Sequence, residues 1–373
     1  MNSWLGEYQD WQKPSVPAAE FPTIFIQGAV DEQLAVASAC DSNAMGAVLT
    51  ASSQSGASKA KRTLSEAVHR HAQHSASPIA LDLSRYSGAG RRRASDPLDP
   101  DWVDQQLTAG AAFALSDSGF VNDGALDELD ALLGNARRLP YLETGRVRTL
   151  IALSSKALRN KSFLAETETR LRDFDHPISL ALEHAKDPLG SAQAVKGLLR
   201  LIDASKDISL NRADYSVFGA VAAGATFGAI GTKPSLRHIY PIPKKPGGPR
   251  RSDDISIVWP HGLSFHRATG LAEVIAFDRD NIRWLCDCPS CEGRSIERLT
   301  VTRRAEAHNL AVGAAIRDRL FPLGRSASSL LAWGEMCTHA QTLMFQLDPR
   351  EALSVPGYLG AWRAAIEDAA RVG

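Results

Sequence analysis

The chain has 373 residues, of which 44% are hydrophobic and 23% are charged, a mixture typical of globular proteins and unlike that of disordered ones. Its 42 basic and 42 acidic side chains cancel, so no overall field attracts nucleic acid or an anionic membrane, and any polyanion site must be a local patch. No apolar run reaches the ~20 residues that span a bilayer, and the first residues lack the features of a secretory signal. The expected location is therefore the cytoplasm.

Short apolar segments rich in β-branched residues recur along the first part of the chain and predict strands. They begin at Thr23, Met45, Pro78, Ala112, Thr149, Pro177, Ile208 and Ala225. Uniformly apolar strands are typical of a parallel sheet covered on both faces. The segments between them have helical periodicity, as in residues 126–139 and in the segment that starts at Ala192. Eight strands alternating with helices over ~210 residues favour an α/β TIM (β/α)8 barrel, and a doubly wound open sheet is the alternative.

The pattern changes after Thr232. Residues 233–254 are rich in proline, glycine and basic side chains and predict a loop, and residues 254–259 predict a further strand. A cysteine cluster follows, then a helix over 303–321 and a C-terminal helical segment.

The cysteine cluster predicts a metal site. Three of the five cysteines fall within six residues: Cys286, Cys288 and Cys291. Zinc prefers four ligands in a tetrahedron, and thiolates with an imidazole suit it. His308, the nearest downstream histidine, is the expected fourth ligand, with His266 and His339 as alternatives. Because four protein ligands leave no open position, the predicted Zn²⁺ is structural; a reactive or merely buried thiol cluster is the alternative interpretation.

The predicted organisation has four parts. An N-terminal segment covers 1–20, the barrel 21–235, a zinc-binding insertion with its following helix 236–320, and a C-terminal helical segment 321–373. The remaining cysteines, Cys40 and Cys337, are predicted to be buried thiols.

These residues, taken in order with the strands, resemble the tRNA-guanine transglycosylase family. That family is a TIM barrel with an inserted zinc subdomain of pattern C-x-C-x-x-C followed by H-N, here Cys286, Cys288, Cys291 and then His308-Asn309. The gap before the histidine is shorter than in the tRNA enzymes, which fits the branch that installs 7-deazaguanine derivatives in DNA. The resemblance covers roughly Phe21 to Leu320.

The resemblance implies roles for carboxylates at strand ends. The segment ALDLSRY resembles the family strand that ends in D-S-G-G-F, which makes Asp82 the acid/base aspartate. Asp117 is similar in position to the aspartate that binds the base edge, and a carboxylate can accept the N–H donors of a guanine-like base. Glu183 and His184 end the strand that resembles G-L-x-V-G-E, and because neighbouring strand residues face opposite sides, Glu183 is favoured for substrate binding.

The eighth strand departs from the family. The family's nucleophilic aspartate ends this strand, but residues 226–233 contain no carboxylate. Base exchange needs a carboxylate that attacks the sugar C1′. Three explanations stay open: a nucleophile from elsewhere (Asp253, Asp254 or Asp214), a noncovalent reaction, or a loss of catalysis with a binding role like that of one subunit of the eukaryotic heterodimeric enzyme.

Further polar residues follow predicted strands or lie in predicted loops. Arg212 and Asp214 are spaced to share a face, either as substrate-binding residues or as an ion pair that caps the barrel. The basic loop residues are Arg91, Arg92, Arg93, Lys244, Lys245, Arg250 and Arg251. Exposed basic side chains on adaptable backbone suit phosphate contacts, so these residues are predicted to contact nucleic acid, and a solvated loop is the alternative.

The leading hypothesis is a transglycosylase-like enzyme that acts on guanine or 7-deazaguanine bases in tRNA or DNA. One alternative is a noncatalytic nucleic-acid-binding or accessory subunit of the same family. A second is a barrel enzyme that acts on a free nucleoside. The resemblance also implies a homodimer or a heteromeric partner.

Overall fold

The first nine strands form one parallel sheet. The computed structural model describes residues 23–52, 56–242, 254–322, 324–348 and 352–372. The strands are β1 Ile24–Ala29, β2 Gly46–Thr50, β3 Ile79–Asp82, β4 Ala114–Leu115, β5 Phe120–Val121, β6 Val147–Ser154, β7 Ile178–Glu183, β8 Ile208–Ala213 and β9 Gly228–Gly231. Each of the eight predicted segments overlaps one of these strands, and β5 is an additional short strand beside β6.

The sheet curls into a barrel. The strand order is β3-β2-β1-β9-β8-β7-β6-β4, so the first strand pairs with the last, and every pairing is parallel. The two ends of this order meet where the amide of Ala112 donates to the carbonyl oxygen of Ile79 at 2.8 Å. The fold is the predicted (β/α)8 barrel.

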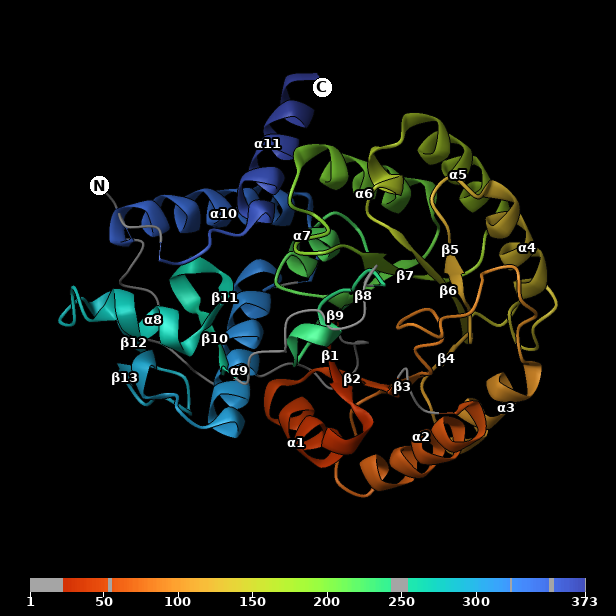
Figure 1. The fold of residues 1–373 in the computed structure, drawn as a ribbon, viewed down its shortest axis with the longest axis horizontal. Helices are drawn as coiled ribbons and strands as arrows, with labels where there is room; N and C mark the ends of the chain where they lie inside the picture. The colour runs from red at the N-terminus through yellow and green to blue at the C-terminus, as the bar shows by residue number, and fades with distance from the viewer. Residues whose placement is uncertain (1–22, 53–55, 243–253, 323, 349–351, 373) are drawn as a thin grey trace.

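Helices surround the strands, as Figure 1 shows. They are α1 Gln33–Asn43, α2 Ala57–Ala72, α3 Pro100–Ala109, α4 Leu126–Ala136, α5 Lys161–Phe174, α6 Ala192–Ala204 and the short α7 Val217–Ala222. Local sequence fixes several starts: Asp99 accepts from two amides of the first turn of α3, and Asn160 and Ser191 cap α5 and α6 in the same way.

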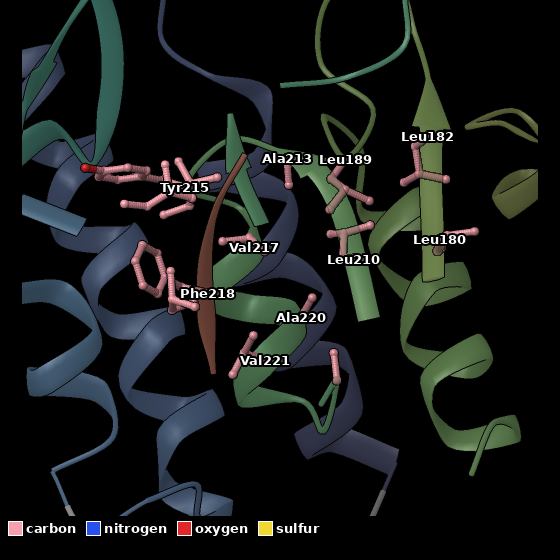
Figure 2. Close-up of a cluster of buried hydrophobic side chains, with 14 of the residues drawn as sticks. Leu180, Leu182, Leu189, Leu210, Ala213, Tyr215, Val217, Phe218, Ala220 and Val221 are labelled. Carbon is pink, nitrogen blue, oxygen red and sulfur yellow. The ribbon is translucent and has the colours of Figure 1, made fainter. Parts of the chain in front are cut away.

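The core has two layers because strand side chains alternate between the faces of the barrel. In the outer layer, Leu180 and Leu182 of β7 and Leu210 of β8 lie in one cluster with Val217 and Val221 of α7 (Figure 2). One inner cluster consists of Phe25, Val48, Ala80, Phe113, Leu115, Phe227 and Ala229. A second inner cluster consists of Tyr86, Phe120, Leu150, Ala152, Ala181 and Ile239. The interior is thus a packed core, as expected for this fold.

The rest of the chain builds a lobe beside the barrel (Figure 1). It contains β10 Ser256–Trp259, β11 Ser264–Arg267, α8 Ala268–Ile275, β12 Leu285–Cys286, β13 Arg294–Ser295, α9 Thr302–Leu320, α10 Ala327–Leu347 and α11 Gly357–Val372. The strand predicted over 254–259 and the helix predicted over 303–321 are confirmed. Cys40 and Cys337 are buried as predicted. Among the described residues, no helix is both long and apolar enough to cross a membrane.

Candidate functional site

The four predicted metal ligands lie together. The sulfur atoms of Cys288 and Cys291 are each 3.3 Å from Nδ1 of His308, and that of Cys286 is 3.6 Å from it. All four residues are buried, and their ligand atoms lie within 4.8 Å of one another. The cluster can hold a metal ion, and it selects His308 over His266 and His339 as the fourth member.

Local backbone geometry creates the cluster. The antiparallel pair β12 and β13 brings Cys286 beside Arg294, and the amide of Gly293 donates to the carbonyl oxygen of Cys286 at 3.0 Å. The amide of Cys291 donates to the carbonyl oxygen of Cys288 at 2.9 Å. This tight turn points three sulfurs at one place. Three sulfurs and one imidazole nitrogen are a donor set that zinc prefers in structural sites.

A backbone carbonyl group orients the imidazole of His308. Nε2 of His308 lies 2.8 Å from the carbonyl oxygen of Val258 on β10, so the proton belongs on Nε2 and Nδ1 is free to bind a metal. The neighbouring Asn309 makes two hydrogen bonds to the same strand. Its Oδ1 accepts from the amide of Val258 at 2.7 Å, and its Nδ2 donates to the carbonyl oxygen of Ser256 at 2.9 Å. Helix α9 therefore anchors to β10 at the metal cluster.

Asp82, the predicted acid/base residue, lies at the carboxyl end of β3 and is only 2% exposed. Its Oδ2 accepts from the hydroxyl of Tyr86 at 2.6 Å, from Nε2 of Gln27 at 3.2 Å and from Oγ1 of Thr50 at 3.3 Å. Its Oδ1 accepts from the amide of Ser84 at 2.7 Å. Burial raises the pKa of Tyr86 well above its ordinary value, so this hydroxyl stays a donor. Asp82 is held by hydrogen bonds on both oxygens.

Arg212 supplies the counter-charge. Its Nε lies 3.7 Å from Oδ2 of Asp82, and its guanidinium lies 5.0 Å from the ring centre of Tyr86. The residue has a left-handed φ of 50°, and the β8–β9 register shifts between Leu210 and Ala213. This irregularity turns Arg212 toward Asp82. The strict alternation expected for Arg212 and Asp214 is thereby interrupted.

The loop after β3 brings two arginines to the other predicted carboxylates. Arg91 forms an ion pair with Glu183 and lies 3.7 Å from the ring centre of Phe120. Arg92 donates to Oδ2 of Asp117 at 2.8 Å. Two of the predicted nucleic-acid contacts are thus paired with two of the predicted substrate-binding carboxylates.

The other basic residues differ in placement. Arg93 is exposed, and its amide donates to Asp96 at 3.2 Å. Four predicted contacts lie outside the described residues: Lys244, Lys245, Arg250 and Arg251. The same holds for Asp253, whereas Asp254 is described and accepts from the hydroxyl of Thr269 at 2.5 Å.

Asp214 lies just after β8 and beside a second carboxylate, Asp187. Burial and the charge of Asp214 raise the pKa of Asp187 to about 7, and burial also raises that of Asp214. Asp187 accepts from the amide of Tyr358 at 2.8 Å, at the start of α11. The pair therefore joins the end of the barrel to the C-terminal helix.

The end of β9 has no room for a side chain on the inner face. Ala229 belongs to the inner cluster, so Gly231, two residues later, has the same orientation. A Cβ at Gly231 would lie 2.3 Å from the carbonyl oxygen of Leu236 and 2.7 Å from the amide nitrogen of Arg237. The main chain that follows β9 occupies the space that a side chain at Gly231 would need.

Several hydrogen-bond partners of Asp82 at the carboxyl end of the barrel, which we call the mouth, were not predicted from the sequence. Gln27 and Thr50 end apolar strands and carry no motif, and Tyr86 stands in an irregular loop. The spacing along the strands was the available signal. Gln27 lies two residues after Phe25, and Thr50 two residues after Val48, so each polar side chain shares the inner face with an apolar one.

No protein-family model matches the sequence, and no curated protein matches it significantly. Among solved structures, a mutant tryptophan synthase α-subunit from Pyrococcus furiosus is similar with a TM-score of 0.33 at 13% identity, covering 56% of this chain and 86% of that one. A putative dihydrodipicolinate synthase family protein from Coccidioides immitis has a TM-score of 0.35 at 11% identity, covering 96% of this chain and 97% of that one. These similarities are too distant to indicate a function. The barrel is assigned from the strand order of this chain itself.

Proposed function

We propose that this protein is a noncatalytic relative of the tRNA-guanine transglycosylases, an accessory subunit that binds a guanine-like base or its nucleic acid without exchanging the base. The main support for this proposal is the lack of space for a side chain at the end of β9. The family's nucleophile belongs there, and here backbone atoms of Leu236 and Arg237 would clash with any side chain at Gly231. A covalent exchange at that position needs a carboxylate that the chain cannot place.

The remaining carboxylates support the same proposal. A general base must reach the proton that it takes, and Asp82 is buried with hydrogen-bond donors on both oxygens. Glu183 and Asp117 are each paired with an arginine of the loop after β3. These groups stabilise the mouth of the barrel and leave no unpaired carboxylate among the three.

A structural zinc ion fits the cysteine cluster. Tetrahedral zinc with Zn–S bonds of ~2.3 Å and a Zn–N bond of ~2.0 Å separates sulfur from nitrogen by ~3.5 Å. The three sulfur to nitrogen distances of 3.3, 3.3 and 3.6 Å agree with that separation. With four protein ligands the ion would cross-link the cysteine turn to α9, which is itself hydrogen-bonded to β10, and it would have no position for a substrate.

The test is a base-exchange assay on zinc-loaded protein. Radiolabelled guanine or a 7-deazaguanine precursor is incubated with tRNA and with duplex DNA in separate tubes, and binding of each polymer is measured by fluorescence anisotropy. The expected result is binding of one polymer without incorporation of label. Incorporation into either polymer would refute the noncatalytic proposal, and binding of neither would refute the nucleic-acid part.

Base exchange through Asp214 is the second candidate function. This carboxylate follows β8 and has a pKa raised by burial, beside the second carboxylate Asp187, which are features of an acid/base or nucleophilic group. Under this alternative, wild type incorporates label and Asp214→Asn does not, whereas Asp104→Asn, an exposed aspartate on α3, behaves like wild type.

A further inference from the structure

A buried hydrogen bond joins the end of β8 to the helix that carries the fourth metal ligand. Tyr215 lies two residues after β8 and is completely buried. Its hydroxyl donates to the carbonyl oxygen of Asn309, the residue that follows His308 on α9. In Figure 2 the hydroxyl oxygen of Tyr215 lies on the side away from β7. One side chain therefore connects the barrel to the metal lobe.

The acceptor of this hydrogen bond is fixed beside the metal cluster. The side chain of Asn309 makes two hydrogen bonds to β10, and Nε2 of His308 lies 2.8 Å from the carbonyl oxygen of Val258 on the same strand. A Cβ at Gly313, one helical turn after Asn309, would lie 3.4 Å from the Tyr215 hydroxyl, so the glycine leaves room for it. A displacement of His308 would therefore also displace the acceptor of Tyr215.

The ring of Tyr215 is held between the barrel and the lobe. It packs edge to face against Phe218 of α7, with ring centres 5.5 Å apart, and against Phe265 of β11, with ring centres 5.1 Å apart. A ring packed on both sides transmits a displacement of its hydroxyl to its own backbone, because close-packed interiors have little free space.

The backbone just before Tyr215 is irregular. The register of β8 on β9 shifts between Leu210 and Ala213, so the two residues between them lie outside the regular ladder. One of the two, Arg212, has a left-handed φ of 50°, and its amide donates to Oε1 of Gln27 at 2.6 Å. Strained backbone persists only where its surroundings hold it. Gln27 holds this segment from the barrel, and Tyr215 holds it from the lobe.

A separate contact attaches the lobe to β9. Nε of Arg237 donates to the carbonyl oxygen of Gly231 at 3.2 Å, and its Nη1 donates to Oγ of Ser256 on β10 at 2.9 Å. The guanidinium also lies 3.3 Å from the ring centre of Phe265 on β11. Removal of the Tyr215 hydroxyl would leave these contacts in place, so the lobe would stay attached to the barrel.

We propose that Tyr215 is a positioning residue that links metal binding to the mouth of the barrel. A metal ion at the cysteine cluster fixes α9, α9 fixes the Tyr215 hydroxyl, and Tyr215 fixes the end of β8 with Arg212 facing Asp82. Because coupling between two sites is reciprocal, Tyr215 in turn favours metal binding. This link goes beyond the proposed function and rests only on its metal site.

Competition with a chromophoric chelator measures the affinity of the full-length protein for Zn²⁺. Tyr215→Phe keeps the packed ring and removes only the hydroxyl, so it should bind Zn²⁺ about fivefold more weakly than wild type. Tyr358→Phe is the matched control, because its buried hydroxyl donates to the carbonyl oxygen of Leu263, in the turn between β10 and β11 instead of on α9. The control should stay within about twofold of wild type. Equal affinities of the two variants would overturn the proposal.

Amide hydrogen exchange tests the effect on β8 itself. In wild type, removal of Zn²⁺ should raise exchange in residues 208–216 at least about threefold more than in β6, two strands away. Zinc-loaded Tyr215→Phe should already show raised exchange in residues 208–216. An equal rise in both strands, or no rise in zinc-loaded Tyr215→Phe, would overturn the link. A wild-type protein that binds no Zn²⁺ would refute the metal site, and the link with it, so the two failures are distinguishable.

Discussion

The metal cluster and the barrel mouth both gather buried polar side chains, but their partners come from different distances along the chain. Three ligands of the cluster lie within six residues, and the fourth is 17 residues after Cys291. In the mouth, Arg91 pairs with Glu183 over 92 residues, and Arg212 reaches Ser84 over 128. Local spacing therefore predicts the cluster as a set, whereas the mouth can be predicted only residue by residue.

The metal cluster and the mouth also differ in the source of their counter-charges. In the cluster, three cysteines and one histidine could together hold a metal ion, and thiolate ligands would take their counter-charge from that ion. In the mouth, each predicted carboxylate has a cation or donors from the protein itself. The cluster therefore suits a bound metal ion, whereas the paired carboxylates of the mouth stabilise the end of the barrel.

Loss of one thiolate should have the largest effect. Cys288→Ala should remove the metal and destabilise the protein by more than ~4 kcal/mol, because metal binding contributes directly to folding. Elemental analysis and urea unfolding measure the two effects. Cys337→Ala, which removes a buried thiol outside the cluster, should keep one metal ion per chain. Equal metal content in both variants would contradict the assignment.

Loss of the two hydrogen bonds between Asn309 and β10 should have a smaller effect on stability. Asn309→Ala leaves an amide and a carbonyl oxygen of β10 without partners and should cost ~2 kcal/mol in the free energy of unfolding. Asn122→Ala, whose side chain donates to Glu128 in solvent, should cost less than ~0.5 kcal/mol. Similar losses in the two variants would mean that α9 does not depend on this contact.

The ion pair across the mouth should show measurable coupling. A double-mutant cycle of Arg91→Gln and Glu183→Gln should give a coupling energy of ~1–2 kcal/mol, because both side chains are largely shielded from solvent. The same cycle on the exposed pair Lys206 and Asp175 should give a value near zero. Equal coupling in the two pairs would mean that the mouth is open to solvent.

Asp187 should make stability depend on pH. Its folded pKa of about 7 exceeds the ordinary value of 3.8, so the folded state holds the proton more tightly and loses relative stability as pH rises from 4 to 7. Asp187→Asn keeps a cap for α11 and should be ~1 kcal/mol more stable than wild type at pH 8, with no difference near pH 4. Thermal unfolding across this range measures it, and a constant difference at all pH values would contradict the assignment.

The sequence predicted the barrel because its signals are local. Each strand is a short apolar segment, and the sheet order follows from alternation with helices. Cys286, Cys288, Cys291 and His308 were predictable for a similar reason, since metal chemistry restricts both residue type and spacing. The pairing of Asp82 with Arg212 was not predictable, because it depends on a left-handed residue inside a strand, and no glycine or proline marks it. The backbone beside Gly231 was likewise hidden, because it comes from a segment without regular strand pattern.

We propose that the carboxylates of the mouth stabilise the barrel instead of performing chemistry. The most direct test is the free energy of unfolding of Asp82→Asn, measured with urea beside the exposed variant Asp104→Asn. Asp82→Asn leaves Arg212 buried without its counter-charge, so we expect a loss of ~3 kcal/mol, against less than ~0.5 kcal/mol for the control. An Asp82→Asn protein as stable as wild type, or more stable, would contradict the claim, because catalytic carboxylates are commonly held at a cost in stability.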